Sequence, residues 1–461
     1  MSTEIRAARR VDARAIGAAV AIAVVARVAV AAAVPLSQPV FDMAEYWTRA
    51  LHLLEHGQLS PDTGRMPGLP LLLSALFAWT GEPSLAWARG LNVVAGAATT
   101  ALTYLLARRA ASPRASFVAS LAVALYPTLL VYTPLVTTET VVMAPLMGAL
   151  LAAASTSPRA AAVAGVLAGV ATLVRPAGIA VLPAVLLAAL RPWDRADRWF
   201  AARRLGAGAL VVIGFVLVLA PWWLHGLRHQ SRFVPLDTTS GHNFLIGSGP
   251  YATGRYRFTA VVRQTNEFLV GVDPTTPEGS AHAAAVAWAH VRAEPGTALA
   301  LIPAKLGYLL ALEGNELAYL YSIGHFGKVG TRAIWTWAVA MLAAFPALLA
   351  AAVAGLATRH AGSAPVRGPA VCYLLAAAAL SVIAFGEPRF HLPFVPVLAV
   401  LATGVARRRE GWHRGAVVAG AALLVVLAVV WAGQLGRYLG YVPDLARPGG
   451  WERALSFDDV L

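Results

Sequence analysis

Two acidic residues, Asp42 and Glu139, stand at the starts of predicted helices in a chain that carries few charges. Asp42 directly follows the first long apolar run, and Glu139 opens a later one. A carboxylate within hydrogen-bond reach of an acceptor hydroxyl can remove its proton as a general base. Each acid also has a structural interpretation. Asp42 is placed as the N-cap of the next helix, with Glu45 as its capping-box partner, and Glu139 is placed as a first-turn acid favoured by the helix dipole.

Arginines near the same predicted helix ends offer a complementary chemistry. Arg65 precedes a Pro-Gly turn, Arg175 ends an apolar run, and Arg389 lies in the motif EPRFHLPFVP. A guanidinium group presents forked donors that match a phosphate group. Together these arginines suit an anionic head group, and the alternative for each is an anchor at the membrane interface.

No metal or nucleotide site is predicted. His52 and His56, like His225 and His229, are four residues apart, but no nearby carboxylate completes a set of metal ligands. The single cysteine, Cys372, excludes an intramolecular disulfide and a cysteine-based metal site. The chain has no Walker loop and no GxGxxG motif after a strand, so nucleotide binding has no support. We therefore predict no cofactor, and a divalent metal has no support in the sequence.

The composition predicts a membrane protein with many spans. Hydrophobic residues make up 58% of the chain, charged residues only 13%, and the mean hydropathy is +0.64. A soluble domain has roughly 25% charged residues. The net charge of +14 would suggest nucleic acid in a soluble protein. Here most of the excess lies in Arg clusters between apolar runs, where it orients the protein in the membrane, so we predict no nucleic-acid partner.

Eleven apolar stretches have the composition of membrane-spanning helices, which need about 20 residues and must pair their own backbone groups. They lie near 15–36, 84–107, 114–133, 138–155, 159–174, 177–190, 205–225, 332–357, 369–385, 390–406 and 415–435. Two more apolar stretches, Met66–Thr80 and Gly296–Leu320, are interrupted by proline or charged residues. We interpret these two as helices that lie in the outer interface without crossing.

With the N-terminus in the cytoplasm, this count places every Arg cluster on the cytoplasmic side. We interpret residues 1–461 as one transmembrane domain. Its outer parts are a first outer loop at 37–83 with interfacial helices and the acid Asp42, a large outer loop at 226–331, and an outer C-terminal tail at 437–461. Loops of this length usually carry function.

Residues 44–56 of the first outer loop form an amphipathic pattern. Trp47 and Leu51 lie on its apolar face, and Gly57 is a natural stop. The pattern predicts a helix that lies flat on the membrane surface and sets the direction of the residues just before it.

Short motifs in a fixed order along most of the chain resemble one known family. They are Asp42 and Tyr46, Pro67–Pro70, Tyr126–Pro127, Thr138–Glu139, Leu173–Gly178, Ala220–Trp223, Arg232–Leu236, Thr239–Gly254 and Glu387–Pro396. On these motifs the chain resembles the membrane-embedded C-type (GT-C) glycosyltransferases of the protein-O-mannosyltransferase and lipid A aminoarabinose transferase superfamily. Two departures leave the sugar and acceptor open. Met43 stands where many relatives have a second acid, and His225-Gly226 stands where relatives often have Arg-Asn.

The resemblance implies an all-α, polytopic GT-C fold of about 11 transmembrane helices, with interfacial helices in the first outer loop and a long second outer loop. It implies inverting transfer, at the outer face, of a sugar carried on a polyprenyl phosphate. By the matching motifs, the catalytic acids are Asp42 and Glu139. We assign donor phosphate binding to Arg65, Arg389, Lys305 and Arg175, and the acceptor or donor pocket to Tyr46, Glu45, His391 and Asn243.

The predicted protein is therefore a hexosyl- or pentosyltransferase in a bacterial-type inner or plasma membrane. Its predicted partners are a polyprenyl-phosphate-linked sugar, a cell-envelope lipid, glycan or protein acceptor with a hydroxyl or phosphate group, and membrane lipids. The alternatives are a transporter or flippase, a polymerase or ligase of lipid-linked sugars, and a non-catalytic scaffold. A transporter should show charges at mid-membrane and repeated halves, and the sequence shows neither clearly.

Overall fold

The computed structural model describes residues 3–34, 38–39, 41–191, 198–314, 331–358 and 364–445. Within these ranges the chain is helical, and its only β pairing is an isolated bridge between Thr358 and Trp412. The predicted all-α class is confirmed.

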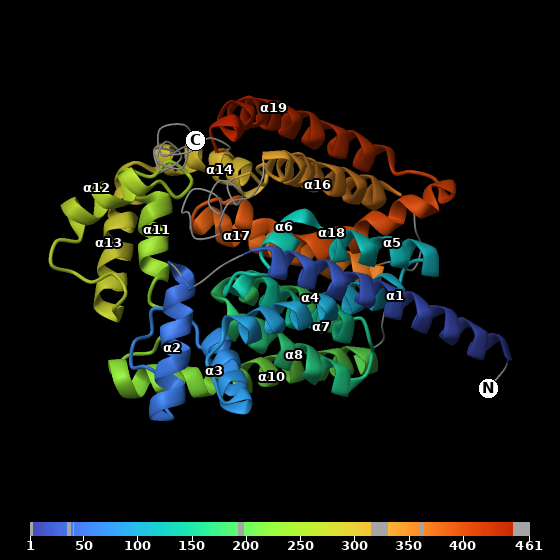
Figure 1. Cartoon of the computed structure of the whole chain (residues 1–461), viewed down its shortest axis with the longest axis horizontal. Coiled ribbons are helices and arrows are strands. Elements are labelled where there is room, and N and C mark those ends of the chain that lie inside the picture. Colours follow the sequence, from blue (N-terminus) through green and yellow to red (C-terminus); the bar gives the residue numbers. More distant parts are fainter. Residues whose placement is uncertain are drawn as a thin grey trace.

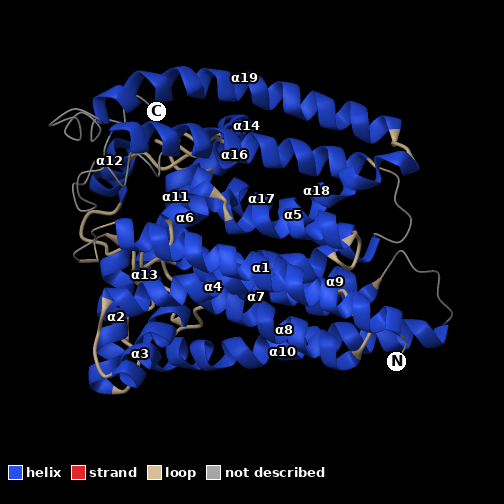
Figure 2. Ribbon diagram, turned by 45° about the vertical axis from the view of Figure 1, so that its right-hand side comes forward, coloured by secondary structure: helices blue, strands red, loops and turns tan. Residues whose placement is uncertain are grey.

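Most helices run side by side along the long axis of the molecule (Figures 1 and 2). This bundle consists of α1 (Thr3–Ala33), α4 (Leu85–Ala107), α5 (Pro113–Ala124), α6 (Pro127–Val131), α7 (Thr138–Ala153), α8 (Pro158–Val174), the 3-10 helix η1 (Pro176–Ala180), α9 (Val181–Leu190), α10 (Arg198–Gln230), α16 (Thr331–Ala357), α17 (Ala364–Ile383), η2 (Pro388–Phe394), α18 (Val395–Ala402), η3 (Thr403–Glu410) and α19 (Arg414–Leu445). Six further helices gather at one end: α2 (Asp42–His56), α3 (Gly68–Thr80), α11 (Ser240–Ser248), α12 (Phe258–Phe268), α13 (Pro277–Ala293) and α14 (Pro295–Leu309).

Within the described part of the chain, seven helical segments are long and apolar enough to cross a membrane: Val11–Ala33, Leu85–Ala107, Ala202–Gln230, Trp335–Ala357, Ala364–Ile383, Pro388–Arg407 and Arg414–Gly436. The other predicted spans also fall on helices, but these are short. The predicted span at 114–133 is divided into α5 and α6, because Pro127 has no N–H to continue the helix. A count of eleven crossings therefore remains a prediction.

The two ends of the bundle differ. At one end α2, α11 and α13 stand across the direction of the bundle, whereas α1 begins at the other end (Figure 1). At that far end lies Arg108, which belongs to the Arg cluster between the spans predicted near 84–107 and 114–133. Its side chain donates to Asp12 of α1 at 2.8 Å. The start of α1 and the helices of the predicted outer loops thus lie at opposite ends. The prediction requires this separation, because it puts the N-terminus and these loops on opposite sides of the membrane.

The predicted surface helix is present as α2. It buries Met43, Tyr46 and Ala50 on one face, and it ends at Gly57. Gly57 adopts a left-handed conformation (φ 66°), and its N–H donates to the carbonyl of Leu53. The helix begins at Asp42, two residues earlier than the pattern suggested.

One buried arginine of the bundle, Arg27, bonds to the end of a broken helix. Arg27 is 1% exposed and donates to the carbonyls of Ala124 (3.0 Å) and Val123 (3.4 Å). The Val123 carbonyl needs this donor because the residue four places on is Pro127, which has no N–H. Arg27 is therefore explained by the helix break, without a role in binding.

Close packing holds the bundle around α8. A Cβ atom on Gly165 would stand 2.1 Å from the carbonyl oxygen of Val211 in α10, and one on Gly169 would stand 2.7 Å from Val218. The GxxxG spacing thus lets α8 and α10 approach closely. This contact fixes the end of α8, where Arg175 is located.

Parts of the predicted loops lie outside the described residues. These are the end of the Gly296–Leu320 stretch beyond residue 314, the rest of the large loop to 330, and the tail from 446 to 461. The start of the predicted tail at 437 is helical, since α19 continues to Leu445.

Candidate active site

A cavity of about 1330 Å³ opens at the end of the bundle where α2 and α11 lie. Eight of the ten predicted site residues line it: Asp42, Glu45, Tyr46, Arg65, Glu139, Arg175, Asn243 and Arg389. They come from α2, the loop after it, the start of α7, the end of α8, α11 and η2. Segments spread over almost 350 residues of sequence therefore meet at one site.

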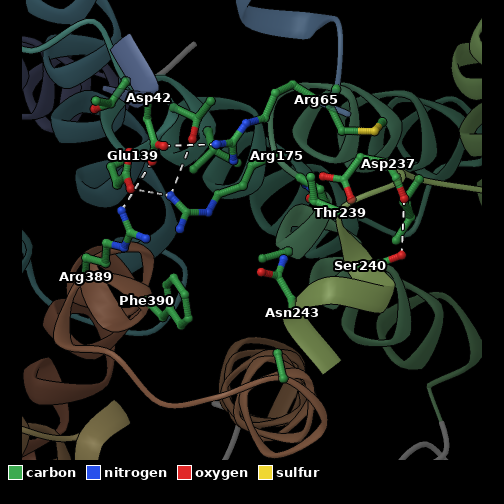
Figure 3. A pocket seen from close by; sticks show the side chains of 18 of the residues that line it. Asp42, Arg65, Glu139, Arg175, Asp237, Thr239, Ser240, Asn243, Arg389 and Phe390 are labelled. Atoms are coloured by element: carbon green, nitrogen blue, oxygen red, sulfur yellow. Dashed lines mark hydrogen bonds and ion pairs between the residues drawn. The ribbon is translucent and has the colours of Figure 1, made fainter. Parts of the chain in front are cut away.

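Asp42 does not cap α2. The N-cap position is taken by Phe41, and no side chain there bonds to the helix N–H groups. Instead the Asp42 carboxylate accepts hydrogen bonds from two arginines, with Oδ1 2.9 Å from Nη2 of Arg65 and Oδ2 3.5 Å from Nη1 of Arg389. The capping interpretation is wrong, because the carboxylate turns away from the helix end and into the cavity (Figure 3).

Glu45 is likewise drawn into this cluster. Its Oε2 accepts a hydrogen bond from Nε of Arg65 at 2.6 Å, so the predicted capping box is not formed. One guanidinium thus holds two carboxylates that lie one helical turn apart on α2. Burial is the largest single effect on Arg65 and opposes its charge, but the hydrogen bond with Glu45 and the charges of Asp42, Glu45 and Tyr46 together outweigh it and raise the pKa of Arg65. Arg65 therefore remains a cation over the whole physiological range.

Glu139 forms the second ion pair of the cavity. It lies in the first turn of α7 and accepts a hydrogen bond from Nη1 of Arg175 at 2.6 Å. Only 6% of its side chain is exposed. Arg175 reaches it from the extended residue between α8 and η1, a conformation that Pro176 favours for the residue before it.

Phe390 packs against one arginine of each ion pair. Its ring centre lies 5.5 Å from the guanidinium carbons of both Arg175 and Arg389. Arg389 and Phe390 are neighbours in η2, which places both side chains at the cavity (Figure 3). Stacking on an aromatic face holds a guanidinium in position while leaving its N–H groups available.

The charges of this cluster balance. Three arginines face the three carboxylates of Asp42, Glu45 and Glu139, and every one of these arginines has an acidic partner. Tyr46 is buried beneath them, with the guanidinium of Arg65 5.9 Å from its ring centre, and burial raises the pKa of its hydroxyl. An incoming anion can therefore bind by exchanging places with a carboxylate.

A second polar surface of the cavity lies at the start of α11. Asp237, Thr239 and Ser240 line it together with Asn243. Asp237 is 8% exposed, and burial raises its pKa to about 6. Of these residues the sequence analysis predicted only Asn243, although the motif TSGHN that surrounds it was among those that carried the resemblance.

Lys305 and His391 do not line the cavity, so the structure does not bring them together with the other predicted site residues. Lys305 is buried, and its Nζ donates to Ser248 Oγ (2.9 Å) and to the carbonyl of Val382 (2.7 Å). It thereby ties α14 to α11 and to the last turn of α17. Burial lowers the pKa of Lys305 to about 8, since desolvation disfavours its charge.

His391 lies on the far side of η2, in a buried polar network. Its Nδ1 is 2.5 Å from the carbonyl of Leu309, and its Nε2 is 2.7 Å from Oε1 of Glu313. Glu313 also accepts hydrogen bonds from Tyr126 (2.7 Å) and from Thr128. His391 and Glu313 are fully buried. The network holds η2, with Arg389 on its other side, against α6 and the turn after α14.

The described part of the chain contains no group of three His, Cys, Asp or Glu side chains placed to hold a metal ion. The polar side chains of the cavity belong to arginines, carboxylates, hydroxyl groups, the amide of Asn243 and the imidazoles of His52 and His242. The rest of its lining is apolar, with Val142 and Leu146 from α7, and Ala377 and Leu380 from α17.

Comparison with known proteins shows which family model and which solved structures the chain is similar to. Residues 64–225 match the family described as Dolichyl-phosphate-mannose-protein mannosyltransferase. This range contains Arg65, Glu139 and Arg175. The sequence has no match among the curated proteins with which it was compared.

Among solved structures, the chain is similar to ArnT from Cupriavidus metallidurans bound to undecaprenyl phosphate. The identity is 16%, the alignment covers 94% of this chain and 69% of ArnT, and the TM-score is 0.51. A match to the archaeal oligosaccharyltransferase AglB from Archaeoglobus fulgidus, in complex with an inhibitory peptide and a dolichol-phosphate, has 15% identity and a TM-score of 0.47. It covers 91% of this chain and 54% of AglB, so the chain spans about half the length of that protein. The GT-C fold and the resemblance predicted from the sequence are confirmed.

Proposed function

Since the chain has the GT-C fold of membrane glycosyltransferases, we propose that it is an inverting glycosyltransferase that uses a sugar linked to a polyprenyl phosphate. The acceptor is a hydroxyl or phosphate group on a cell-envelope lipid, glycan or protein, and transfer takes place at the outer face of the membrane. The donor class is supported by the family match, whose description names a dolichyl-phosphate sugar, and by the undecaprenyl phosphate bound to ArnT.

The observation that carries this proposal is the arrangement of Asp42, Arg65 and Arg389 in one cavity with an apolar wall. Arginine offers forked donors that fit a phosphate and keeps its charge throughout. The apolar wall from α7 and α17 suits an isoprenoid tail. A lipid phosphate therefore finds both of its chemical parts matched in one place.

The proposed reaction is a single displacement at the anomeric carbon. The acceptor oxygen attacks this carbon, the bond between carbon and phosphate oxygen breaks, and polyprenyl phosphate leaves with the electron pair. Asp42 takes the acceptor proton as the new bond forms. Arg65 and Arg389, with Arg175 beside them, stabilise the negative charge that develops on the leaving phosphate.

The ion pairs on Asp42 give the reaction an order of events. Both of its oxygens accept hydrogen bonds from arginines. The donor phosphate competes for these guanidinium groups and releases a carboxylate oxygen to accept the proton. Glu139 keeps Arg175 in place and holds the acceptor side, while Tyr46 and Glu45 support the cluster from α2.

The proposed orientation follows from the arrangement of the helices. The N-terminus is cytoplasmic, and the described parts of the outer loops at 37–83 and 226–331 form the end of the bundle that contains the cavity. The larger loop shapes the acceptor side through α11 and its neighbours.

The test is sugar transfer by the purified protein with undecaprenyl phosphates that bear single sugars, together with acceptors from the cell envelope. Asp42→Asn keeps the shape of the side chain and removes its ability to take a proton. We expect it to insert and elute like the wild type and to lose about 100-fold or more in transfer rate. Wild-type transfer by this variant would remove Asp42 from the base role. Movement of the lipid across vesicles without any transfer would favour the transporter instead.

A further inference from the structure

The cavity has two polar walls of different chemistry. One is the cluster of arginines and carboxylates. The other is formed by Asp237, Thr239, Ser240 and Asn243, which we call the α11 wall. In Figure 3 the α11 wall lies across the cavity from Asp42, Glu139 and Arg389. A ligand that fills the cavity is therefore bound by both walls.

Asn243 is the residue of the α11 wall that is open to a ligand. It lies in the first turn of α11, where its backbone N–H donates to the carbonyl of Thr239 at 2.9 Å. Its carboxamide makes no hydrogen bond with any described part of the chain, and it points into the cavity (Figure 3). The helix thus fixes the position of an amide that has two N–H donors and an acceptor oxygen to offer.

Asp237 adds acceptor capacity beside Asn243. Thr239 and the backbone N–H groups of Thr239 and Ser240, at the start of α11, stabilise the charge of its buried carboxylate and oppose the larger effect of burial on its pKa. Ser240 donates in turn to the carbonyl of Asp237 at 3.2 Å. A carboxylate has about four lone-pair positions, so this role in the helix start does not use all of them.

The two walls differ in what they can bind. An arginine only donates hydrogen bonds, so the arginine cluster suits a phosphate, which only accepts them. A sugar hydroxyl both donates and accepts, and an amide beside a carboxylate can meet both needs. In a lipid-linked donor the sugar is attached directly to the phosphate. A phosphate at the arginine cluster therefore places its sugar next to the α11 wall.

We propose that the α11 wall is a sugar-binding site that recognises the hydroxyl groups of the donor sugar, with Asn243 as its main hydrogen-bonding residue. This inference rests on the proposed function, because it takes the phosphate of the donor to lie at the arginine cluster. It goes beyond that function by assigning the choice among sugars to α11, a helix of the large outer loop. A glycan acceptor offers the same hydroxyl chemistry, and the experiment below separates the two sources.

The experiment measures binding of two kinds of lipid to the purified full-length protein. The probes are bare undecaprenyl phosphate, and undecaprenyl phosphate that bears mannose, glucose, galactose or arabinose. We expect the wild type to bind at least one sugar-bearing lipid more tightly than the bare lipid. Asn243→Ala should weaken the binding of that lipid about threefold to tenfold, as expected for one lost hydrogen bond, and leave the binding of the bare lipid unchanged.

Two variants serve as controls. Asn266→Ala removes the same kind of side chain from α12, where Asn266 is exposed and does not line the cavity, so binding of both lipids should be unchanged. Arg389→Ala should weaken the binding of both lipids to the same extent, because both carry the phosphate.

The outcomes separate this inference from the proposed function. No binding of bare undecaprenyl phosphate by the wild type, or no effect of Arg389→Ala on it, would count against the proposed function. Binding of the bare lipid with no preference for any sugar, or equal weakening of both lipids by Asn243→Ala, would overturn the sugar-binding site alone. If Asn243→Ala changes only the KM of a glycan acceptor, the wall binds acceptor and the assignment to donor is wrong.

Discussion

Arg389 and Asp42 are 347 residues apart in the chain, yet Nη1 of Arg389 lies 3.5 Å from Oδ2 of Asp42. The contact joins η2 to the first turn of α2. It is longer than the 2.9 Å bond from Arg65 to the other oxygen of the same carboxylate, and longer than the usual range for an N–H···O bond. Arg389 is therefore the partner that a phosphate can draw away from Asp42 at the lower cost.

Arg389→Ala is expected to lower the rate of sugar transfer about 100-fold to 1000-fold, the usual effect of losing one preorganised donor to a developing negative charge. Arg389→Lys should recover only part of the loss, because lysine keeps the charge without the forked geometry. Transfer rates with saturating acceptor are the measurement. Arg263→Ala removes the same charge from α12, where Arg263 packs on Tyr251, and should leave transfer unchanged. Wild-type rates in Arg389→Ala would exclude Arg389 from the site.

Glu139→Gln is expected to destabilise the protein as well as to lower its activity. The change leaves Arg175 charged in a mostly buried position, and breaking one side of a buried ion pair costs about 3–5 kcal/mol. The midpoint of thermal unfolding in detergent should fall. The double variant Glu139→Gln/Arg175→Gln should recover part of that stability and none of the activity. If Glu139→Gln unfolds at the same temperature as the wild type, the ion pair of Glu139 and Arg175 contributes little to the stability of the fold.

The sequence predicted the class of fold, and it pointed to most of the charged residues that meet in the cavity, because both depend on local patterns. Long apolar runs predict helices in a membrane, and the Arg clusters predict which ends of these helices face the cytoplasm. Polar residues at the ends of those runs, such as Asp42, Glu139 and Arg175, then fall on one face of the molecule. The contacts between them agree with that expectation.

Lys305 and His391 show where this reasoning stops. Both are polar residues near the outer ends of helices, but the direction of each side chain depends on what the neighbouring helices offer. Lys305 meets a free carbonyl at the end of α17, and His391 meets the carboxylate of Glu313. These partners are distant in sequence, so no local pattern reveals them. Asp237 lies between α10 and α11, and it lines the cavity because of where the fold places that whole segment, which its local sequence does not reveal.

The pH dependence of stability should reveal Asp237. Burial raises its pKa in the folded protein from 3.8 to about 6, so between these values the folded state binds the proton more tightly than the unfolded state. Asp237 therefore contributes stability below pH 4 that is lost as the pH rises to 6, by an amount of about 3 kcal/mol. Asp237→Asn cannot titrate. The difference in unfolding midpoint between variant and wild type should grow in favour of the variant from pH 4 to pH 6 and then stay constant. A difference that does not change with pH would contradict the raised pKa.

The buried pair of His391 and Glu313 should control the position of Arg389 without touching a substrate. The pair is fully buried. His391 belongs to η2, as does Arg389, but its side chain points away from the cavity that Arg389 lines. Glu313→Gln keeps a hydrogen-bonding side chain of the same size, whereas Glu313→Leu leaves His391, Tyr126 and Thr128 without their shared acceptor. We expect Glu313→Leu to weaken binding of undecaprenyl phosphate about tenfold or more and to lower the unfolding midpoint, and Glu313→Gln to keep most of both. Tyr126→Phe, which removes one hydrogen bond of the network and keeps the contact between His391 and Glu313, should have the smallest effect. If Glu313→Leu binds the lipid like the wild type although its stability is reduced, the network supports the fold alone and does not position Arg389.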